Sequence, residues 1–150
     1  MSKLGGTFEA TFDVGAAPDV AAAHFADLNA VAAATLHLIE HTLIDAHTMR
    51  VVLAEQGHAG VRYQPKYTVR YTSEPGRVRW ATLEGNLDNE GEARFEATAT
   101  GTRIHFKQRI GMDLPIGGLA ARVLAPVVSR AIAPSARAFV EALIASIPRP

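Results

Sequence analysis

The sequence predicts an α+β protein in which a curved antiparallel sheet wraps around one long C-terminal helix. Two observations predict this fold class. The run from Pro115 to Pro148 is rich in alanine, long enough for a helix, and more apolar than a helix exposed to water needs to be. The middle of the chain alternates apolar and polar residues, which is typical of strands with one buried face. We expect the sheet and the helix to shield each other's apolar face from water.

The N-terminal part of the chain predicts one strand followed by two short helices. Residues 7–14 alternate between polar and apolar side chains, as a half-buried strand does. A proline followed by an aspartate then favours the start of a helix over 18–27. Leu28 and Asn29 interrupt the alanine-rich run, so a second short helix is expected over 30–34.

Six further strands are expected between the short helices and the C-terminal run. Their ranges are 37–45, 48–55, 61–71, 77–84, 92–99 and 102–114. Loops are expected over 56–60 and 85–91, where glycine and polar residues gather. Pro65 cannot donate to a sheet ladder and therefore predicts a bulge or a locally unpaired neighbour. The apolar register becomes ambiguous over 81–83, which also indicates a bulge.

The apolar face of the C-terminal run changes direction along its length. The seam that follows Pro134 is rotated by roughly 140° from the seam that precedes it, on the geometry of a regular helix. Pro126 and Pro134 each remove a backbone donor, so we expect a kink at Pro126 and a stronger kink or break at Pro134. Arginine and proline residues leave no clean apolar stretch of about 20 residues, which argues against a membrane span. A membrane-surface helix stays open as an alternative.

Length and composition favour one cytoplasmic domain over residues 1–150. Lys plus Arg number 15 and Asp plus Glu number 15, so the formal net charge of zero draws the protein to neither nucleic acid nor an anionic membrane. The chain of 150 residues has no cysteine, which excludes disulfides, thiolate catalysis and cysteine-ligated zinc, and which fits a reducing compartment. The N-terminus lacks the continuous apolar region of a signal peptide.

The order of elements resembles the helix-grip fold of the START/Bet v 1-like (SRPBCC) superfamily, which includes polyketide cyclases/dehydrases and lipid-transport proteins. Short sequence segments also resemble those of this superfamily. They are 17–20 (APDV) with 25–27 (FAD), 75–80 (PGRVRW), 101–104 (GTRI) and the C-terminal amphipathic helix. The resemblance implies a seven-stranded sheet, two short helices after the first strand, and a cavity that binds apolar small molecules or lipids. It implies no common set of catalytic residues, so it predicts a ligand cavity but neither the ligand nor a reaction.

Aromatic side chains on the inward face of the strands are the candidate ligand-binding residues. They are Tyr63, Tyr67, Tyr71, Trp80 and Phe106. A pocket lined by apolar and aromatic groups with a few polar tips is the usual small-molecule site, although a solid core would use the same residues. Gln108 interrupts the inward series of the last strand, and a buried amide must be hydrogen-bonded. Its partner is either a polar ligand atom or a tyrosine or backbone carbonyl.

Candidate catalytic residues are fewer. His41 or Glu40 could act as an acid or base, depending on which face of strand 37–45 points inward, and the pattern does not choose between the faces. His37 and His41 lie on one face but about 13 Å apart, too far for one metal ion, so neither a metal nor a cofactor is expected. The sequence shows no complete catalytic constellation, which favours a binder over an enzyme.

These observations lead to three functional hypotheses. The first is a binder or carrier of a hydrophobic small molecule such as a lipid, an isoprenoid or a polyketide-like aromatic. The second is a cyclase- or dehydratase-like enzyme that uses His41 or Glu40 with a tyrosine. The third is a protein-interaction or membrane-surface module with an exposed apolar edge over 114–119, whose membrane contact would be at most transient. Basic residues on the outer face alternate with acidic ones, which favours cross-strand charge pairing over nucleic-acid binding. The oligomeric state stays open.

Overall fold

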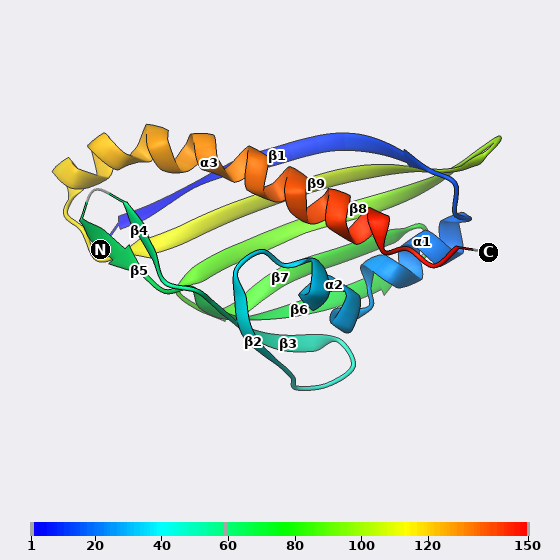
Figure 1. The fold of residues 1–150 in the computed structure, drawn as a ribbon, viewed down its shortest axis with the longest axis horizontal. Coiled ribbons are helices and arrows are strands. Elements are labelled where there is room, and N and C mark those ends of the chain that lie inside the picture. The colour runs from blue at the N-terminus through cyan, green and yellow to red at the C-terminus, as the bar shows by residue number, and fades with distance from the viewer. Residues whose placement is uncertain (1, 59, 150) are drawn as a thin grey trace.

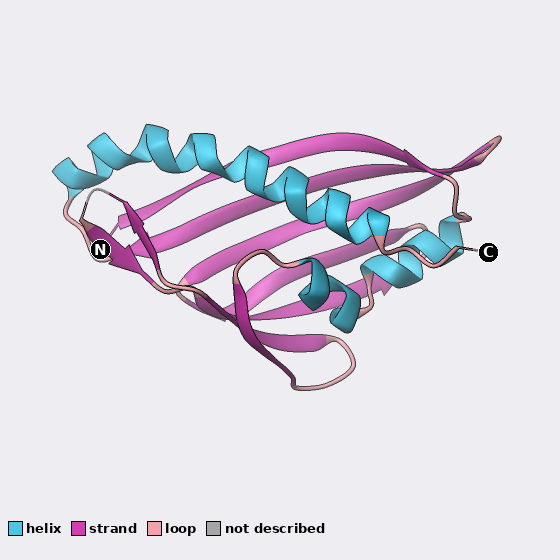
Figure 2. Ribbon diagram, viewed as in Figure 1, coloured by secondary structure: helices cyan, strands magenta, loops and turns pink. Residues whose placement is uncertain are grey.

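The computed structural model describes residues 2–58 and 60–149, and it has the predicted architecture (Figure 1). Seven antiparallel strands form one sheet in the order β1-β9-β8-β7-β6-β3-β2. These strands are β1 (Ser2–Val14), β2 (Leu38–Leu43), β3 (Thr48–Leu53), β6 (Lys66–Glu74), β7 (Arg77–Gly85), β8 (Leu87–Thr98) and β9 (Gly101–Leu114). The helices are α1 (Pro18–Phe25), α2 (Leu28–Ala34) and α3 (Gly118–Ala145), and they lie on one face of the sheet (Figure 2). The predicted helix-grip fold is confirmed.

The break between the two short helices lies two residues earlier than predicted, at residues 26–27. Asp27 is the N-cap of α2, because its Oδ1 accepts hydrogen bonds from the backbone N–H groups of Asn29 at 3.0 Å and Ala30 at 3.3 Å. Leu28 and Asn29 therefore form the first turn of α2 and do not separate the helices. Aspartate is among the strongest N-cap residues because its oxygen satisfies N–H groups that have no partner inside the helix.

The long helix α3 is continuous through both prolines. Of the two outcomes predicted at Pro134, a stronger kink or a break, the break is therefore wrong. Figure 1 shows α3 as one gently bowed ribbon that runs diagonally across the sheet. Its buried side chains are Leu124, Val128, Ile132, Ala136, Val140 and Leu143. A spacing of four residues turns the seam by about 40° at each step, so the seam winds around the helix gradually. A twisted sheet accommodates that winding without an abrupt change of helix direction.

The winding seam packs into two separate apolar clusters. The C-terminal half of α3 joins the main core, in which Ala136, Val140 and Leu143 lie with the inward side chains of the sheet and of α1 and α2. The N-terminal half joins a smaller cluster, in which Leu124 and Val128 lie with residues from the ends of β1 and β9. The helix therefore spans two regions of solid packing.

The first part of the predicted loop over 56–60 is instead a short strand, and residue 59 lies outside the described residues. β4 (Gln56–His58) pairs with β5 (Val61–Tyr63) in a separate two-stranded sheet. The predicted single strand 61–71 is thus two strands, with Gln64 and Pro65 between β5 and β6. Pro65 has no N–H to donate, and its carbonyl accepts a hydrogen bond from the backbone of Leu53 at 3.0 Å. The expected irregularity at Pro65 is where the chain leaves the hairpin and enters the main sheet.

The predicted loop over 85–91 is also wrong, since β8 begins at Leu87 and pairs with β9 along its whole length. The bulge predicted over 81–83 is confirmed: Val69 pairs with Thr82 and Thr68 with Glu84, which leaves Leu83 as the extra residue on β7. Backbone pairing between β7 and β8 is limited to residues 77–80 and 91–94. The two strands therefore separate beyond Trp80, and side chains span the gap.

The two clusters predict that leucines of the same helix respond differently to truncation. Leu143→Ala removes a side chain that is 1% exposed in the main core, and we expect it to lower the free energy of unfolding by about 2–5 kcal/mol. Leu119→Ala removes a side chain that is 79% exposed, and a change within about 0.5 kcal/mol is expected. Urea denaturation of both variants measures the difference. Equal losses would contradict the placement of α3.

Candidate functional site

A cavity of about 350 Å³ lies between α3 and the sheet, and side chains of both core clusters contribute to its wall. The sheet supplies Tyr67, Val69 and Tyr71 from β6, Leu87 and Asn89 from β8, and Gln108, Ile110 and Met112 from β9. The helix α3 supplies Val128, Ala131, Ile132, Ser135, Ala136 and Phe139. Alternate residues of a strand point to the same face, which is why each strand contributes residues two apart. Most of the wall is apolar, and its polar groups gather at two places.

The first polar group of residues lies at the sheet and is centred on Asn89. The Asn89 Oδ1 accepts a hydrogen bond from Trp80 Nε1 at 3.0 Å and a second from Gln108 Nε2 at 2.8 Å. Tyr67 and Tyr71 lie on the same wall. We call Tyr67, Tyr71, Trp80, Asn89 and Gln108 the inner polar cluster. It includes residues of four neighbouring strands, β6 to β9, at the point where β7 and β8 separate.

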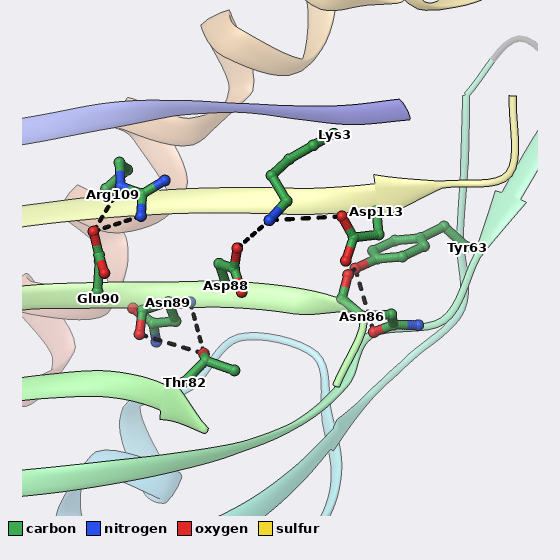
Figure 3. Close-up of polar contacts among 9 residues, drawn as sticks. All are labelled: Lys3, Tyr63, Thr82, Asn86, Asp88, Asn89, Glu90, Arg109 and Asp113. Carbon is green, nitrogen blue, oxygen red and sulfur yellow. Dashed lines mark hydrogen bonds and ion pairs between the residues drawn. The ribbon is translucent and has the colours of Figure 1, made fainter. Parts of the chain in front are cut away.

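Thr82 holds Asn89 in place across the gap between β7 and β8. The Asn89 backbone N–H donates to Thr82 Oγ1 at 2.8 Å, and the Thr82 hydroxyl lies 3.4 Å from the Asn89 carbonyl as its donor (Figure 3). The threonine side chain thus replaces the ladder hydrogen bonds that end at Trp80 and Gly91. Thr82 therefore fixes the Asn89 backbone, while the Asn89 side chain lines the cavity.

Both cavity tyrosines are neutral phenols over the physiological range. Burial raises the pKa of Tyr67 to about 12, and a hydrogen bond from the Asn89 side chain opposes part of that rise. Burial, and to a smaller extent the neighbouring Tyr67, also raises the pKa of Tyr71. Their hydroxyl groups therefore act as hydrogen-bond donors and acceptors, and they carry no charge.

The second polar group lies at the rim of the cavity and includes Thr35, His37, Gln56 and Ser135. His37 has a backbone φ of 60°, and it is the one non-glycine residue with positive φ among residues 2–58 and 60–149. Its carbonyl accepts a hydrogen bond from the backbone of Ala54 at 2.8 Å, which holds the loop before β2 against the end of β3. In the sequence, His37 drew attention only through its spacing from His41, and strand alternation did not predict its place in the cavity wall.

Three of the six residues predicted to bind the ligand line the cavity: Tyr67, Tyr71 and Gln108. Trp80 and Phe106 are buried behind them in an aromatic stack. The Tyr71 and Trp80 rings are 5.6 Å apart between centroids, and those of Trp80 and Phe106 are 5.4 Å apart. These two residues support the wall and do not form its surface.

Tyr63 lies away from the cavity wall, in the smaller core cluster with Leu4 and Leu124. Its hydroxyl donates to the backbone carbonyl of Asn86, just before β8 (Figure 3). The Asn86 side chain in turn accepts a hydrogen bond from the Lys66 backbone at 2.8 Å. Tyr63 therefore attaches the β4–β5 hairpin to the main sheet, a structural role that strand alternation alone did not distinguish from a cavity role.

The acid–base hypothesis for His41 and Glu40 is not supported, because both side chains are exposed and neither lines the cavity. The strand β2 is the edge of the sheet, beyond the part that the helices cover (Figure 1). Even its apolar residues Ile39 and Leu43 are 59% and 45% exposed. Leu38 alone among the β2 residues packs against the main core, and the other five are exposed whichever face they lie on, so the pattern could not distinguish the two faces.

Gln108 is buried as predicted, but its partner is neither a tyrosine nor a backbone carbonyl. The partner is Asn89, a residue that sequence reasoning assigned to a loop. A signal was present: Leu87, Asn89, Gly91, Ala93 and Phe95 continue a spacing of two back from the recognised part of the strand. Gly91 pairs with Gln108 across the ladder and has no side chain to obstruct the amide.

The outer face of the sheet carries a shallow basic depression, which ion pairs largely neutralise. Arg79 pairs with Glu74 at 3.1 Å, and Arg109 pairs with Glu90, its register partner on β8, at 2.8 Å between Nε and Oε1. This arrangement agrees with the cross-strand charge pairing expected from the sequence.

Over residues 2–58 and 60–149, no group of three or more histidine, aspartate or glutamate side chains is placed to hold a metal ion.

Comparison with protein families finds a match over nearly the whole chain. Residues 6–147 match the family described as polyketide cyclase / dehydrase and lipid transport. A search of curated protein sequences found no match.

Solved structures share the fold at low sequence identity. The protein TTHA0849 from Thermus thermophilus is 16% identical with a TM-score of 0.72, over 94% of this chain and 96% of that one. A START superfamily protein from Mycobacterium smegmatis is 12% identical with a TM-score of 0.65, over 94% and 96%. The Zhui aromatase/cyclase from Streptomyces sp. R1128 is 14% identical with a TM-score of 0.64, over 97% and 94%. At such identities the likeness concerns the fold alone.

The raised pKa of Tyr67 predicts a loss of stability in alkali. The unfolded chain loses the phenolic proton near the ordinary pKa of 10.0, whereas the folded protein keeps it until about 12. Between these values the unfolded state binds fewer protons, so the free energy of unfolding falls as the pH rises, by about 2–3 kcal/mol in all.

Urea denaturation at neutral pH and at increasing pH above 10 measures this loss in the natural protein and in Tyr67→Phe. The variant is expected to lose less stability over the alkaline range, and its difference at neutral pH provides the baseline. Parallel curves for the two proteins would show that Tyr67 is not buried as described.

Proposed function

Because the chain belongs to the polyketide cyclase / dehydrase and lipid transport family, we propose that it binds and carries a hydrophobic small molecule in the cavity between α3 and the sheet. One observation carries this proposal: an apolar cavity of about 350 Å³ whose polar groups are few and point inward. Small-molecule sites have this character and begin at about this size. Lipids, isoprenoids and polyketide-like aromatics are the ligand classes that such a wall suits.

The chemistry of the wall favours binding over catalysis. Among the described residues that line the cavity, the side chains that can exchange a proton are His37, Tyr67 and Tyr71, and none is a carboxylate. The raised pKa values keep both phenols protonated, so neither supplies a phenolate base, and both remain available as hydrogen-bond donors. A carrier needs an apolar wall and a few orienting donors, and both are present.

A cyclase- or dehydratase-like activity is the second candidate, and the position of His37 favours it. This histidine lies at the rim in a strained backbone conformation, and such conformations concentrate at functional sites. Imidazole is also the side chain most often used as a general acid or base. An enzyme on this scaffold would use His37, and turnover that disappears in His37→Asn but survives in His41→Asn would favour this candidate. Asparagine suits the test because it tolerates positive φ.

A surface role for α3 is the weaker alternative. The apolar edge expected over 114–119 is only partly exposed, since Leu114 is buried. Leu119, Val123 and Val127 continue it as an exposed stripe at intervals of four residues. By length and hydropathy α3 could cross a membrane, but core helices have the same properties, and its inner face is buried against the sheet. Liposome sedimentation at low and high salt separates this role from internal binding.

The carrier proposal predicts that one residue on the cavity-facing side of α3 controls binding. Ala131 is exposed and lines the cavity, so Ala131→Trp places a large side chain at the cavity opening, and we expect it to weaken ligand binding at least about tenfold, because the indole occupies space that the ligand needs. Ala133→Trp is the matched control, since Ala133 is also exposed, lies two residues away and does not line the cavity.

Native mass spectrometry and solvent extraction of the purified proteins identify the bound molecule, and calorimetric titration measures its affinity for both variants. Ligand bound by the natural protein and by Ala133→Trp, but not by Ala131→Trp, supports the proposal. Equal binding by all three proteins would move the ligand out of this cavity.

A further inference from the structure

We infer that the ligand places an uncharged polar group against the inner polar cluster, where the otherwise buried Tyr71 presents a hydroxyl without a hydrogen-bond partner among the described residues. This inference rests on the proposed function and names the chemical class of the innermost end of the ligand. Two observations carry it: the hydrogen bonds of the cluster, and the distribution of charge over the two faces of the sheet.

Three members of the inner polar cluster hold one another in place. The indole N–H of Trp80 can only donate, and it donates to Asn89 Oδ1 at 3.0 Å. Gln108 donates to the same oxygen from its Nε2 at 2.8 Å. These hydrogen bonds fix the indole and the two amides without any contribution from a ligand.

The Tyr71 hydroxyl takes no part in this network. Tyr71 is 5% exposed, lines the cavity and stacks on the Trp80 ring at 5.6 Å between centroids. Its hydroxyl forms no hydrogen bond with another residue of 2–58 or 60–149, yet no fully enclosed side-chain oxygen or nitrogen of these residues lacks a partner. The hydroxyl is therefore accessible, and because the rest of the side chain is buried, the space that it reaches is the cavity. A ligand group that hydrogen-bonds to it gains affinity over an apolar group.

The phenols of the cavity wall do not distinguish donors from acceptors. A phenolic hydroxyl can donate one hydrogen bond and can also accept. Tyr71 therefore fits an alcohol as well as a ketone, an ester or an amide, and Tyr67 on the same wall has the same capacity. The cluster selects hydrogen-bonding groups over apolar ones, without selecting among the neutral groups.

The charge of these strands lies on the outer face of the sheet. The polar side chains that line the cavity are amides, hydroxyls and one histidine, His37, which is exposed at the rim. Strand alternation places the charged neighbours of Asn89 and Gln108 on the opposite face. There Glu90 pairs with Arg109 at 2.8 Å between Oε1 and Nε, so these two charges neutralise each other.

An ionic group at the inner polar cluster would lose its water and gain no counterion. Removing a charge from water in this way is far more costly than removing a neutral polar group. An ionic group at the other end of a ligand would stay in water, because His37 and Ser135 at the rim are exposed. The selection against charge therefore applies to the innermost end of the ligand.

Five probes with one aromatic body test the inference by calorimetric titration at neutral pH: ethylnaphthalene, hydroxymethylnaphthalene, acetylnaphthalene, naphthoate and aminomethylnaphthalene. The hydroxymethyl and aminomethyl groups have nearly the shape of ethyl, and the carboxylate has nearly the shape of acetyl, so polarity and charge change while shape is retained. The two neutral polar probes are expected to bind about three- to tenfold more tightly than ethylnaphthalene, which is the value of one neutral hydrogen bond. The two ionic probes are expected to bind no more tightly than ethylnaphthalene.

The variant Tyr71→Phe removes the hydroxyl and retains the ring. It is expected to reduce the preference for hydroxymethylnaphthalene over ethylnaphthalene to less than about twofold, because the hydrogen bond is lost while the apolar wall is unchanged. Since the hydroxyl has no described protein partner, the variant is expected to unfold at the same urea concentration as the natural protein.

Tyr63→Phe is the matched control. It removes a phenol that donates to the Asn86 carbonyl and does not line the cavity. It is expected to keep the preference for the neutral polar probes and to unfold at a lower urea concentration.

The outcomes distinguish the inference from the proposed function. Tighter binding of at least one neutral polar probe than of ethylnaphthalene, lost in Tyr71→Phe, supports the inference. Binding of both neutral polar probes no tighter than that of ethylnaphthalene, tighter binding of either ion, or a preference that survives Tyr71→Phe overturns it and leaves the proposed function in place. A urea midpoint of Tyr71→Phe as low as that of Tyr63→Phe would show a protein partner for the hydroxyl and would also overturn it. Failure of all five probes to bind counts against the proposed function, and the inference falls with it.

Discussion

The structure depends on the burial of one winding seam of α3 against a twisted sheet. Because each buried residue follows the last by four positions over most of the helix, the seam faces one cluster near Leu124 and another near Val140. Beside the cavity the buried seam consists of Ile132 and Ala136. A larger apolar residue at position 136 would fill part of the space. The size of the cavity thus depends on which residues form the seam.

The inner polar cluster adds little to the stability of the core in which it is buried, and this observation bears on its role. Buried amides and phenols add little net stability even when fully hydrogen-bonded, and apolar residues of the same shape serve a core at least as well. The cluster also constrains its surroundings. A side chain at position 91 would lie 2.7 Å from the Trp80 ring, so glycine is required where Trp80 and Gln108 converge. Positions that constrain one another with no gain in stability support the proposal that the cluster serves a polar contact inside the cavity.

Much of the fold, but only part of the site, could be predicted from the sequence. Strand alternation and element order are local properties, so the sheet, both short helices and the irregularity at Pro65 could be expected. The place of Asn89 depends on pairing between β8 and β9, which no local pattern shows, and a run of polar residues there looked like a loop. The exposure of His41 depends on where the helical cover ends. Strand alternation places Tyr63 and Tyr67 on one face, but it does not show that a change of sheet at Pro65 separates them.

The fold depends on apolar burial and the site depends on hydrogen bonds, and this difference explains how solved structures can share the fold at 12–16% identity. Apolar burial is not directional, and many sequences of suitable volume build the same container. Hydrogen bonds are directional, and here one donor-only indole outside the cavity wall requires Asn89 to present its oxygen, and Gln108 therefore presents its amide nitrogen. The polar part of the wall thus depends on particular residues, whereas the apolar part depends on volume alone.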